Sequence, residues 1–163
     1  MVDLFGGGEA ARARLETSTR RMLALAAAEG LPMTARTHTY NSRLAQELGS
    51  WATERGLGPQ YHDAAFRAYF ARAEDISDPE VLVAVASGIG LDPNEARQVL
   101  ETRSHRAAVD AEWSQSRQRG VNAVPTFDCG GQRVVGAHPY EVLAGLVEAS
   151  GARKRSAAEP DRD

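Results

Sequence analysis

The sequence is poor in cysteine, lysine and isoleucine, and it contains no long apolar run. Its 163 residues include one cysteine, Cys129, one lysine, Lys154, and two isoleucines, and aromatic residues make up 6%. A single thiol excludes an intrachain disulfide, a Cys-x-x-Cys redox pair within these residues and a cysteine-rich zinc site. No apolar stretch approaches the roughly 20 residues that a membrane-spanning helix needs, so we expect no membrane insertion.

Charge is nearly balanced along the chain. Nineteen basic and 22 acidic residues give a formal net charge of −3 and an isoelectric point near 5.8. Nucleic-acid binding depends on clustered basic residues, so we expect no nucleic-acid partner. The first ten residues, MVDLFGGGEA, lack the basic and apolar regions of a secretory signal. Together with the single cysteine, this predicts a cytoplasmic location.

Apolar residues recur at helical spacing through most of the chain. Asp before Pro, at Asp78-Pro79 and at Asp92-Pro93, is a typical helix start. The expected helices cover 9–29, a segment that begins after Asn41, a segment from Pro59 to about 73, two segments that begin at Pro79 and Pro93, and about 102–119. Four aromatic residues at helical spacing are expected in the core: Trp51, Phe66, Tyr69 and Phe70.

The pattern changes towards the C-terminus. Residues 124–129 and 132–135 are expected to form an antiparallel hairpin around Gly130-Gly131, followed by a last helix and a polar tail. The sequence therefore predicts an α+β fold in which helices predominate. The expected organisation is a lead-in (1–8), a helical domain (9–119), a hairpin with its helix (120–149) and a disordered tail (150–163).

These segments resemble a known family. GVNAVPTFDCGGQRVVGAHPYEVLAGLVEA resembles the C-terminal half of a thioredoxin fold, where a Val-Pro loop with a cis peptide bond leads into a hairpin and a closing helix. The helical insertion of DsbA-like proteins of the FrnE type is similar to three earlier segments: FGGGEAARARLETSTRRMLALAAAEGLPM, THTYNSRLAQELGSWATERGLG and HDAAFRAYFARAEDISDPEVLVAVASGIGLD. Relatives of that family include kappa-class glutathione transferases and hydroxychromene-carboxylate isomerases. The resemblance runs from Leu4 to Glu148.

The resemblance implies thiol-disulfide oxidoreduction, carried out in the family by a Cys-x-x-Cys at the start of a helix in an N-terminal βαβ unit. Such a unit takes roughly 30 residues or more, and it has no counterpart in this sequence. We therefore expect these 163 residues to be unable to cycle a disulfide by themselves, and we expect no cofactor. Met1 is either the start of the protein or an internal methionine of a longer one.

The candidate binding residues follow from the resemblance. It implies that the Val124-Pro125 loop faces the active site and that the backbone of Val124 pairs with an extended peptide or thiol substrate. Asn41 opens a helix that borders the active-site cleft in the family, and the alternative is that Asn41 only caps this helix. Cys129, beside a Gly-Gly turn, is interpreted as an inert thiol, so no catalytic residue is identified.

Other motifs carry little chemistry. The four histidines have neither HxxxH nor HxH spacing, so no metal site is expected. Gly6-Gly7-Gly8 is interpreted as a helix lead-in, because it lacks the Gly-Lys-Ser/Thr ending of a phosphate-binding loop.

Two alternatives remain beside the oxidoreductase-like function. In the first, the chain is a non-catalytic peptide-binding or assembly module, and a homodimer or a partner chain completes its sheet. In the second, it is a relative of glutathione-dependent isomerases or transferases.

Overall fold

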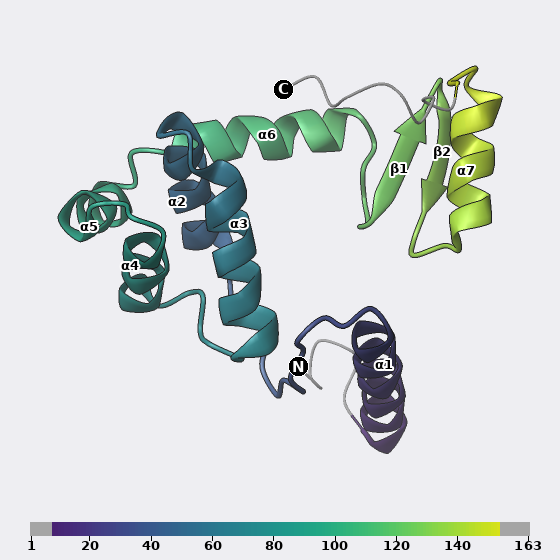
Figure 1. Cartoon of the computed structure of the whole chain (residues 1–163), viewed down its shortest axis with the longest axis horizontal. Coiled ribbons are helices and arrows are strands. Elements are labelled where there is room, and N and C mark those ends of the chain that lie inside the picture. Colours follow the sequence, from purple (N-terminus) through teal and green to yellow (C-terminus); the bar gives the residue numbers. More distant parts are fainter. Residues whose placement is uncertain (1–7, 154–163) are drawn as a thin grey trace. The chain divides into compact units, whose positions relative to one another are not determined.

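The computed structural model describes residues 8–153, which form two compact units divided between Ala111 and Glu112. The first unit contains five helices, α1 (Glu9–Ala28), α2 (Arg43–Glu54), α3 (Gly58–Phe66), α4 (Pro79–Gly88) and α5 (Pro93–Thr102), and a π-helical turn, η2 (Arg67–Ala71). The division falls within α6 (Arg106–Gln118). The second unit continues with β1 (Thr126–Cys129), β2 (Gln132–Val135) and α7 (Tyr140–Ala149), as Figure 1 shows.

The predicted α+β class with a majority of helix is confirmed. None of the helices in residues 8–153 is both long and apolar enough to cross a bilayer. Two predicted features, Gly6-Gly7 of the lead-in and residues 154–163 of the tail, lie outside the described residues.

Helices α4 and α5 begin as their Asp-Pro pairs predict. The Asp78 carboxylate accepts a hydrogen bond from the backbone N–H of Glu80, and the Asp92 carboxylate accepts two, from Asn94 and Glu95. In each case the proline occupies the first helical turn, where a backbone N–H has no partner within the helix. These helix starts are therefore determined by local sequence.

The core of the first unit lies among helices α2 to α5. Leu48, Ala52, Leu82 and Ala86 are fully buried there, and Trp51 is buried as the sequence predicts. This core combines alanines with larger side chains, which include Tyr61, Leu91 and Leu100.

The prediction of a buried aromatic row on the third helix is wrong for Phe66. Its side chain is 60% exposed, whereas Tyr69 and Phe70 are partly buried. The helix widens into the π-helical turn η2 directly after Phe66, which shifts the residues that follow relative to a regular α-helical face. Tyr61 and Ala68 are the buried residues of this segment.

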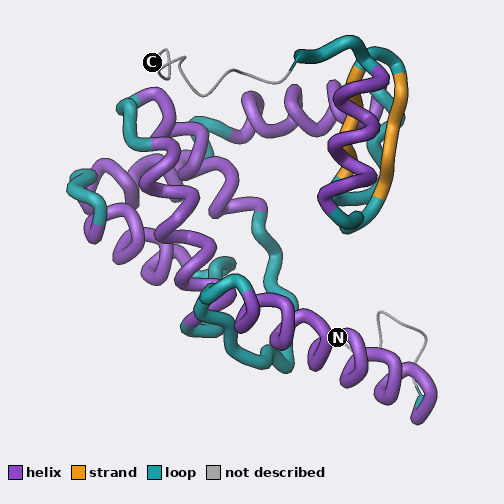
Figure 2. The backbone as a smooth tube through the Cα atoms, turned by 45° about the vertical axis from the view of Figure 1, so that its right-hand side comes forward, coloured by secondary structure: helices purple, strands orange, loops and turns teal. Residues whose placement is uncertain are grey.

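The hairpin of the second unit turns at Gly130-Gly131 as predicted, but its first strand begins at Thr126 rather than at Val124. Strand β1 pairs antiparallel with β2, with Thr126 opposite Val135 and Cys129 opposite Gln132. Gly130 and Gly131 both have positive φ, as the two-residue turn requires. Helix α7 packs against both strands through its buried Leu146 (Figure 2).

Candidate functional site

The Val124-Pro125 loop lies directly before strand β1. The peptide bond between these residues is cis, and the side chain of Val124 is 87% exposed. The carbonyl of Pro125 accepts a hydrogen bond from Gly136 N–H at 2.8 Å, whereas the N–H and C=O of Val124 form no hydrogen bond within residues 8–153. Val124 therefore presents a free backbone donor and a free backbone acceptor on the protein surface.

This free backbone continues along the outer edge of β1. Because Pro125 bonds to Gly136, the alternation of an antiparallel ladder directs the amide groups of Thr126 and Asp128 away from β2. Among the described residues the sheet consists of β1 and β2, so no third strand covers the outer edge of β1. The loop and this edge together, which we call the β1 edge (Val124, Thr126 and Asp128), can pair with an extended chain.

Arg133 of β2 holds the chain that enters the loop. Its guanidinium donates to the carboxylate of Asp128, with Nη2 at 2.6 Å, and to the backbone carbonyls of Arg119 and Gly120, at 2.7 and 3.1 Å. The Thr126 hydroxyl donates to the carbonyl of Ala123 at 2.6 Å. These contacts fix both ends of the segment from 119 to 126.

The hydrogen-bond partner of the Cys129 thiol is a serine hydroxyl. The Sγ of Cys129 lies 2.9 Å from the hydroxyl of Ser150, which itself donates to the carbonyl of Val147. The side chain is half-buried. Among the described residues, no histidine or carboxylate is hydrogen-bonded to Sγ, so no general base is positioned to activate it.

Asn41 stands at the start of α2 but belongs to the other unit, so the structure does not place it in the same site as Val124 and Pro125. Its side-chain carbonyl accepts a hydrogen bond from the backbone N–H of Arg43 at 2.9 Å. The position just before the helix is occupied by Ser42, whose hydroxyl is bonded to Gln46 instead. Asn41 thus satisfies a backbone donor of the first turn, the capping role that the sequence leaves open beside ligand binding.

A buried carboxylate, Glu47, is a feature that sequence reasoning missed. It is fully inaccessible in helix α2, and it is bonded by the guanidinium groups of Arg43 and Arg103 at 2.6–2.7 Å. The hydrogen bonds from Arg103 lower the pKa of Glu47 to about 2 from its usual 4.5, although burial acts in the opposite direction. The sequence does contain a sign of this burial: Glu47 is a charged residue on the apolar helical face that also carries Leu44 and Trp51.

The four histidines are dispersed, and His62 lies against the ring of Phe66. His105 is bonded to Glu54 at 3.0 Å, His38 to Thr37 at 2.8 Å and His138 to the carbonyl of Val135 at 3.0 Å. Residues 8–153 contain no cluster of three or more His, Cys, Asp or Glu side chains that could hold a metal ion.

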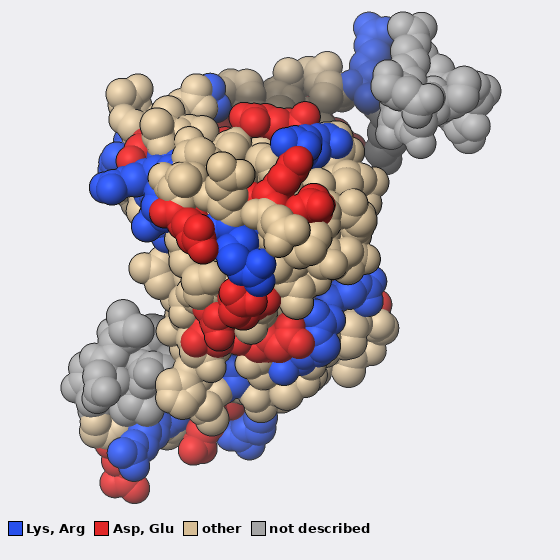
Figure 3. Space-filling model, turned by 90° about the vertical axis from the view of Figure 1, so that its left-hand side faces the viewer, with Lys and Arg blue, Asp and Glu red and all other residues tan. Residues whose placement is uncertain are grey.

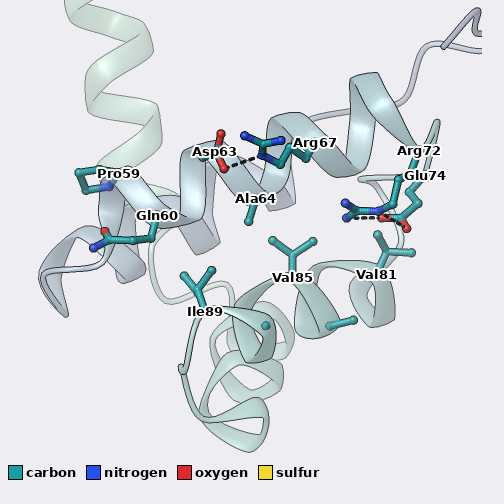
Figure 4. Close-up of a pocket in the computed structure, with 12 residues that line it drawn as sticks. Pro59, Gln60, Asp63, Ala64, Arg67, Arg72, Glu74, Val81, Val85 and Ile89 are labelled. Carbon is teal, nitrogen blue, oxygen red and sulfur yellow. Dashed lines mark hydrogen bonds and ion pairs between the residues drawn. The ribbon is translucent and has the colours of Figure 1, made fainter. Parts of the chain in front are cut away.

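A groove of about 720 Å³ lies between α3 and α4, and the sequence did not predict it. Figure 4 shows Ala64, Val85 and Ile89 directed into it. Ion pairs lie at its rim, Asp63 with Arg67 at 2.7 Å and Arg72 with Glu74 at 2.8 Å. These charges compensate each other, so the groove presents an apolar floor and a nearly neutral rim.

Surface charge agrees with the balanced composition. On the face drawn in Figure 3, basic and acidic side chains are interspersed. The exposed ion pairs of the helical unit include Arg97–Glu80 and Arg55–Glu95. A phosphate backbone would meet alternating attraction and repulsion on this face.

Two solved structures have a fold similar to that of this chain. A probable DsbA oxidoreductase from Streptomyces coelicolor has a similar structure, with a TM-score of 0.71 and 33% identity, over 90% of this chain and 63% of that one. A 2-hydroxychromene-2-carboxylate isomerase also has a TM-score of 0.71, at 21% identity, over 86% of this chain and 67% of the isomerase, and this likeness concerns the fold alone.

Two curated proteins are similar in sequence. The uncharacterized protein YwbO of Bacillus subtilis is 30% identical over 107 residues, 65% of this chain and 53% of YwbO. The ClpXP adapter protein SpxH of Halalkalibacterium halodurans is 26% identical over 86 residues, 48% of this chain and 28% of SpxH. The chain thus spans about half the length of YwbO. The DSBA-like thioredoxin domain matches residues 2–148, and the chain belongs to this family.

Proposed function

We propose that the chain is the substrate-binding part of a DsbA-family thiol-disulfide oxidoreductase of the FrnE type, and that it binds extended peptides at the β1 edge. One observation carries the proposal. Val124, directly before the cis bond to Pro125, is 87% exposed, and its N–H and C=O are both free among the described residues. An added peptide strand would satisfy these groups and those of Thr126 and Asp128.

The redox step itself needs thiols that these 163 residues do not supply. Disulfide exchange proceeds by attack of a thiolate on a disulfide sulfur, and a second thiol then resolves the mixed disulfide. Cys129 is the one cysteine of the sequence, and its thiol is bonded to Ser150. We therefore place the catalytic cysteines outside these residues. We also propose a cytoplasmic location, because these 163 residues, with Cys129 as their one cysteine, form no disulfide among themselves.

Peptide binding is tested by fluorescence anisotropy with a labelled, unstructured decapeptide of alternating valine and serine. We expect saturable binding, and we expect alternate N-methylation of the same peptide to abolish it, because N-methyl groups remove the N–H donors that strand pairing uses. Val124→Ala should bind normally, since recognition uses the backbone. Equal binding of the plain and the N-methylated peptide would contradict the proposal.

The redox part is tested by insulin reduction with dithiothreitol. We expect no acceleration beyond that of a Cys129→Ser variant. A clear acceleration that depends on Cys129 would show that this thiol is catalytic, against the proposal.

The expected pairing of the sheet with a partner chain uses the same edge. This pairing remains a prediction, made because the outer edge of β1 is open. A partner chain bound there would compete with the decapeptide.

A further inference from the structure

The exposed apolar side chains of the first unit are gathered in one place. In residues 8–111 four large apolar side chains are exposed, and all four line one groove of about 520 Å³: Met22, Leu25, Leu31 and Phe66. Met33 and Phe70 extend the apolar wall. We call this the α1 groove. Soluble proteins seldom leave such contiguous apolar surface uncovered, and it usually marks an interaction site.

Helix α1 itself forms one wall of this groove and is little packed. No other helix or strand of the described chain makes extensive contact with it. Leu25, at the centre of the exposed wall, is 57% accessible, which is unusual for a leucine beside two methionines and two phenylalanines. The helix therefore has apolar surface to bury against another molecule.

The charges around Leu25 are arranged in a self-complementary way. Arg21, Leu25 and Glu29 follow each other at intervals of four residues, so they lie in a row along one face of α1. Within residues 8–153, neither Arg21 nor Glu29 forms an ion pair. A positive charge thus precedes the apolar centre, and a negative charge follows it at the same spacing.

We propose that a second copy of this chain occupies the α1 groove. The two α1 helices lie antiparallel, with a two-fold axis beside Leu25. Residues equally distant from Leu25 are then level with each other, so Arg21 of each copy faces Glu29 of the other. Met22 and Leu25 of each copy enter the groove of the other and cover Leu31 and Phe66.

The charge pattern favours a second copy over an unrelated helix. A two-fold interface uses the same patch on both subunits, so the patch must complement itself. An antiparallel pair centred on Leu25 meets this condition at both ends, with two equivalent Arg21–Glu29 contacts. A parallel pair would place Arg21 against Arg21 and Glu29 against Glu29, which is repulsive. This interface is separate from the β1 edge, so it does not depend on the proposed peptide binding.

Sedimentation equilibrium of the full 163-residue chain tests the proposal. We expect a reversible dimer, and we expect Leu25→Glu to weaken it by at least about tenfold, because each copy would then bury a carboxylate beside the other at the axis. The matched control is Val142→Glu on α7, which also replaces an exposed apolar helical residue and should leave the dimer intact. Circular dichroism checks that each variant keeps its helix content.

Charge reversal tests the antiparallel register. Arg21→Glu and Glu29→Arg should each weaken the dimer, because each creates two like-charge contacts. The double variant Arg21→Glu/Glu29→Arg should restore it, since the pairing is regained with opposite sign, and loss of helix stability alone would not be reversed in this way. A monomeric wild-type chain, an unaffected Leu25→Glu dimer or failure of the double variant to recover would each overturn the proposal.

Discussion

Arg103 closes over the buried carboxylate of Glu47 with two hydrogen bonds, from Nε to Oε2 at 2.6 Å and from Nη2 to Oε1 at 2.7 Å. Arg103 ends helix α5 in the left-handed conformation, with φ of 54°, which costs a non-glycine residue roughly 1–2 kcal/mol. The bonds to Glu47 offset this cost. They connect the end of α5 to the middle of α2, and Arg43 connects the same carboxylate to Asp110 on α6.

Substitution of Glu47 should destabilise the helical unit strongly. In Glu47→Gln the two guanidinium groups keep their charges but lose the buried anion that compensates them. Breaking a buried ion pair in this way costs about 3 kcal/mol, and we expect a loss of that size in urea unfolding. Glu80→Gln is the control, because it removes a carboxylate that is also bonded by an arginine, Arg97, but on the surface. Equal losses for the two variants would contradict the special role of Glu47.

The same carboxylate should make stability depend on acid pH. The pKa of Glu47 is about 2 in the folded protein, compared with 4.5 for an ordinary glutamate, which is the value expected in the unfolded chain. A carboxyl group with a lowered folded pKa stabilises fully above its unfolded pKa, and this contribution is lost as pH falls from about 4.5 towards 2. A pKa lowered this far corresponds to a contribution on the order of 3 kcal/mol at neutral pH.

Unfolding in urea at pH 7 and pH 3 measures this contribution. The free-energy difference between wild type and Glu47→Gln should be largest at pH 7 and should shrink at pH 3. A difference that stays constant over this range would show that another group carries the acid sensitivity.

The helix boundaries show how far local sequence determines this fold. Asp78 and Asp92 cap helices that start where their Asp-Pro pairs predict, because every interaction involved lies within three residues. The break at Arg103 was not predictable in this way. The sequence separates two helices near residue 102, but no glycine marks the left-handed conformation of Arg103, and its hydrogen-bond partner Glu47 lies 56 positions away in the sequence.

In the candidate site, too, some features follow from local sequence and others from distant contacts. The hairpin and the Val124-Pro125 loop have local signals, a Gly-Gly turn and a Val-Pro pair, and a family resemblance adds the cis bond to them. Arg133 holds the loop by donating to the backbone carbonyls of Arg119 and Gly120. Because backbone carbonyls occur at every residue, the sequence does not indicate which of them Arg133 bonds. The groove beside Phe66 is lined by residues of α1 and by residues more than 30 positions later in the sequence, and helical periodicity does not predict which segments come together.

Removal of one hydroxyl from the core should stabilise the protein. Tyr61 is 1% exposed, and its hydroxyl has no hydrogen-bond partner among the described residues. Burial raises the pKa of Tyr61, so the phenol stays protonated and its polar group remains unsatisfied. Tyr61→Phe removes that penalty without opening a cavity, and we expect a gain of about 1 kcal/mol in urea unfolding.

Tyr140→Phe is the matched control for this gain. Tyr140 is exposed on α7, so its hydroxyl is hydrated and its loss should leave stability unchanged. A Tyr61→Phe variant that is less stable than wild type would show that the buried hydroxyl has a partner, such as an ordered water molecule.

The last prediction concerns Arg133 as a positioning residue for the β1 edge. Its planar guanidinium bonds Asp128 and, on the other side, the two carbonyls that end α6, five and four residues before Val124. Lysine keeps the charge but cannot bond all three groups in this fixed geometry. We expect Arg133→Lys to reduce affinity for the valine-serine decapeptide by about tenfold, because the loop then samples conformations that misalign Val124. Arg117→Lys, on the exposed surface of α6, should leave affinity unchanged. A structural role limited to overall folding would lower the melting temperature of Arg133→Lys without changing affinity at low temperature, so the two measurements separate positioning from stability.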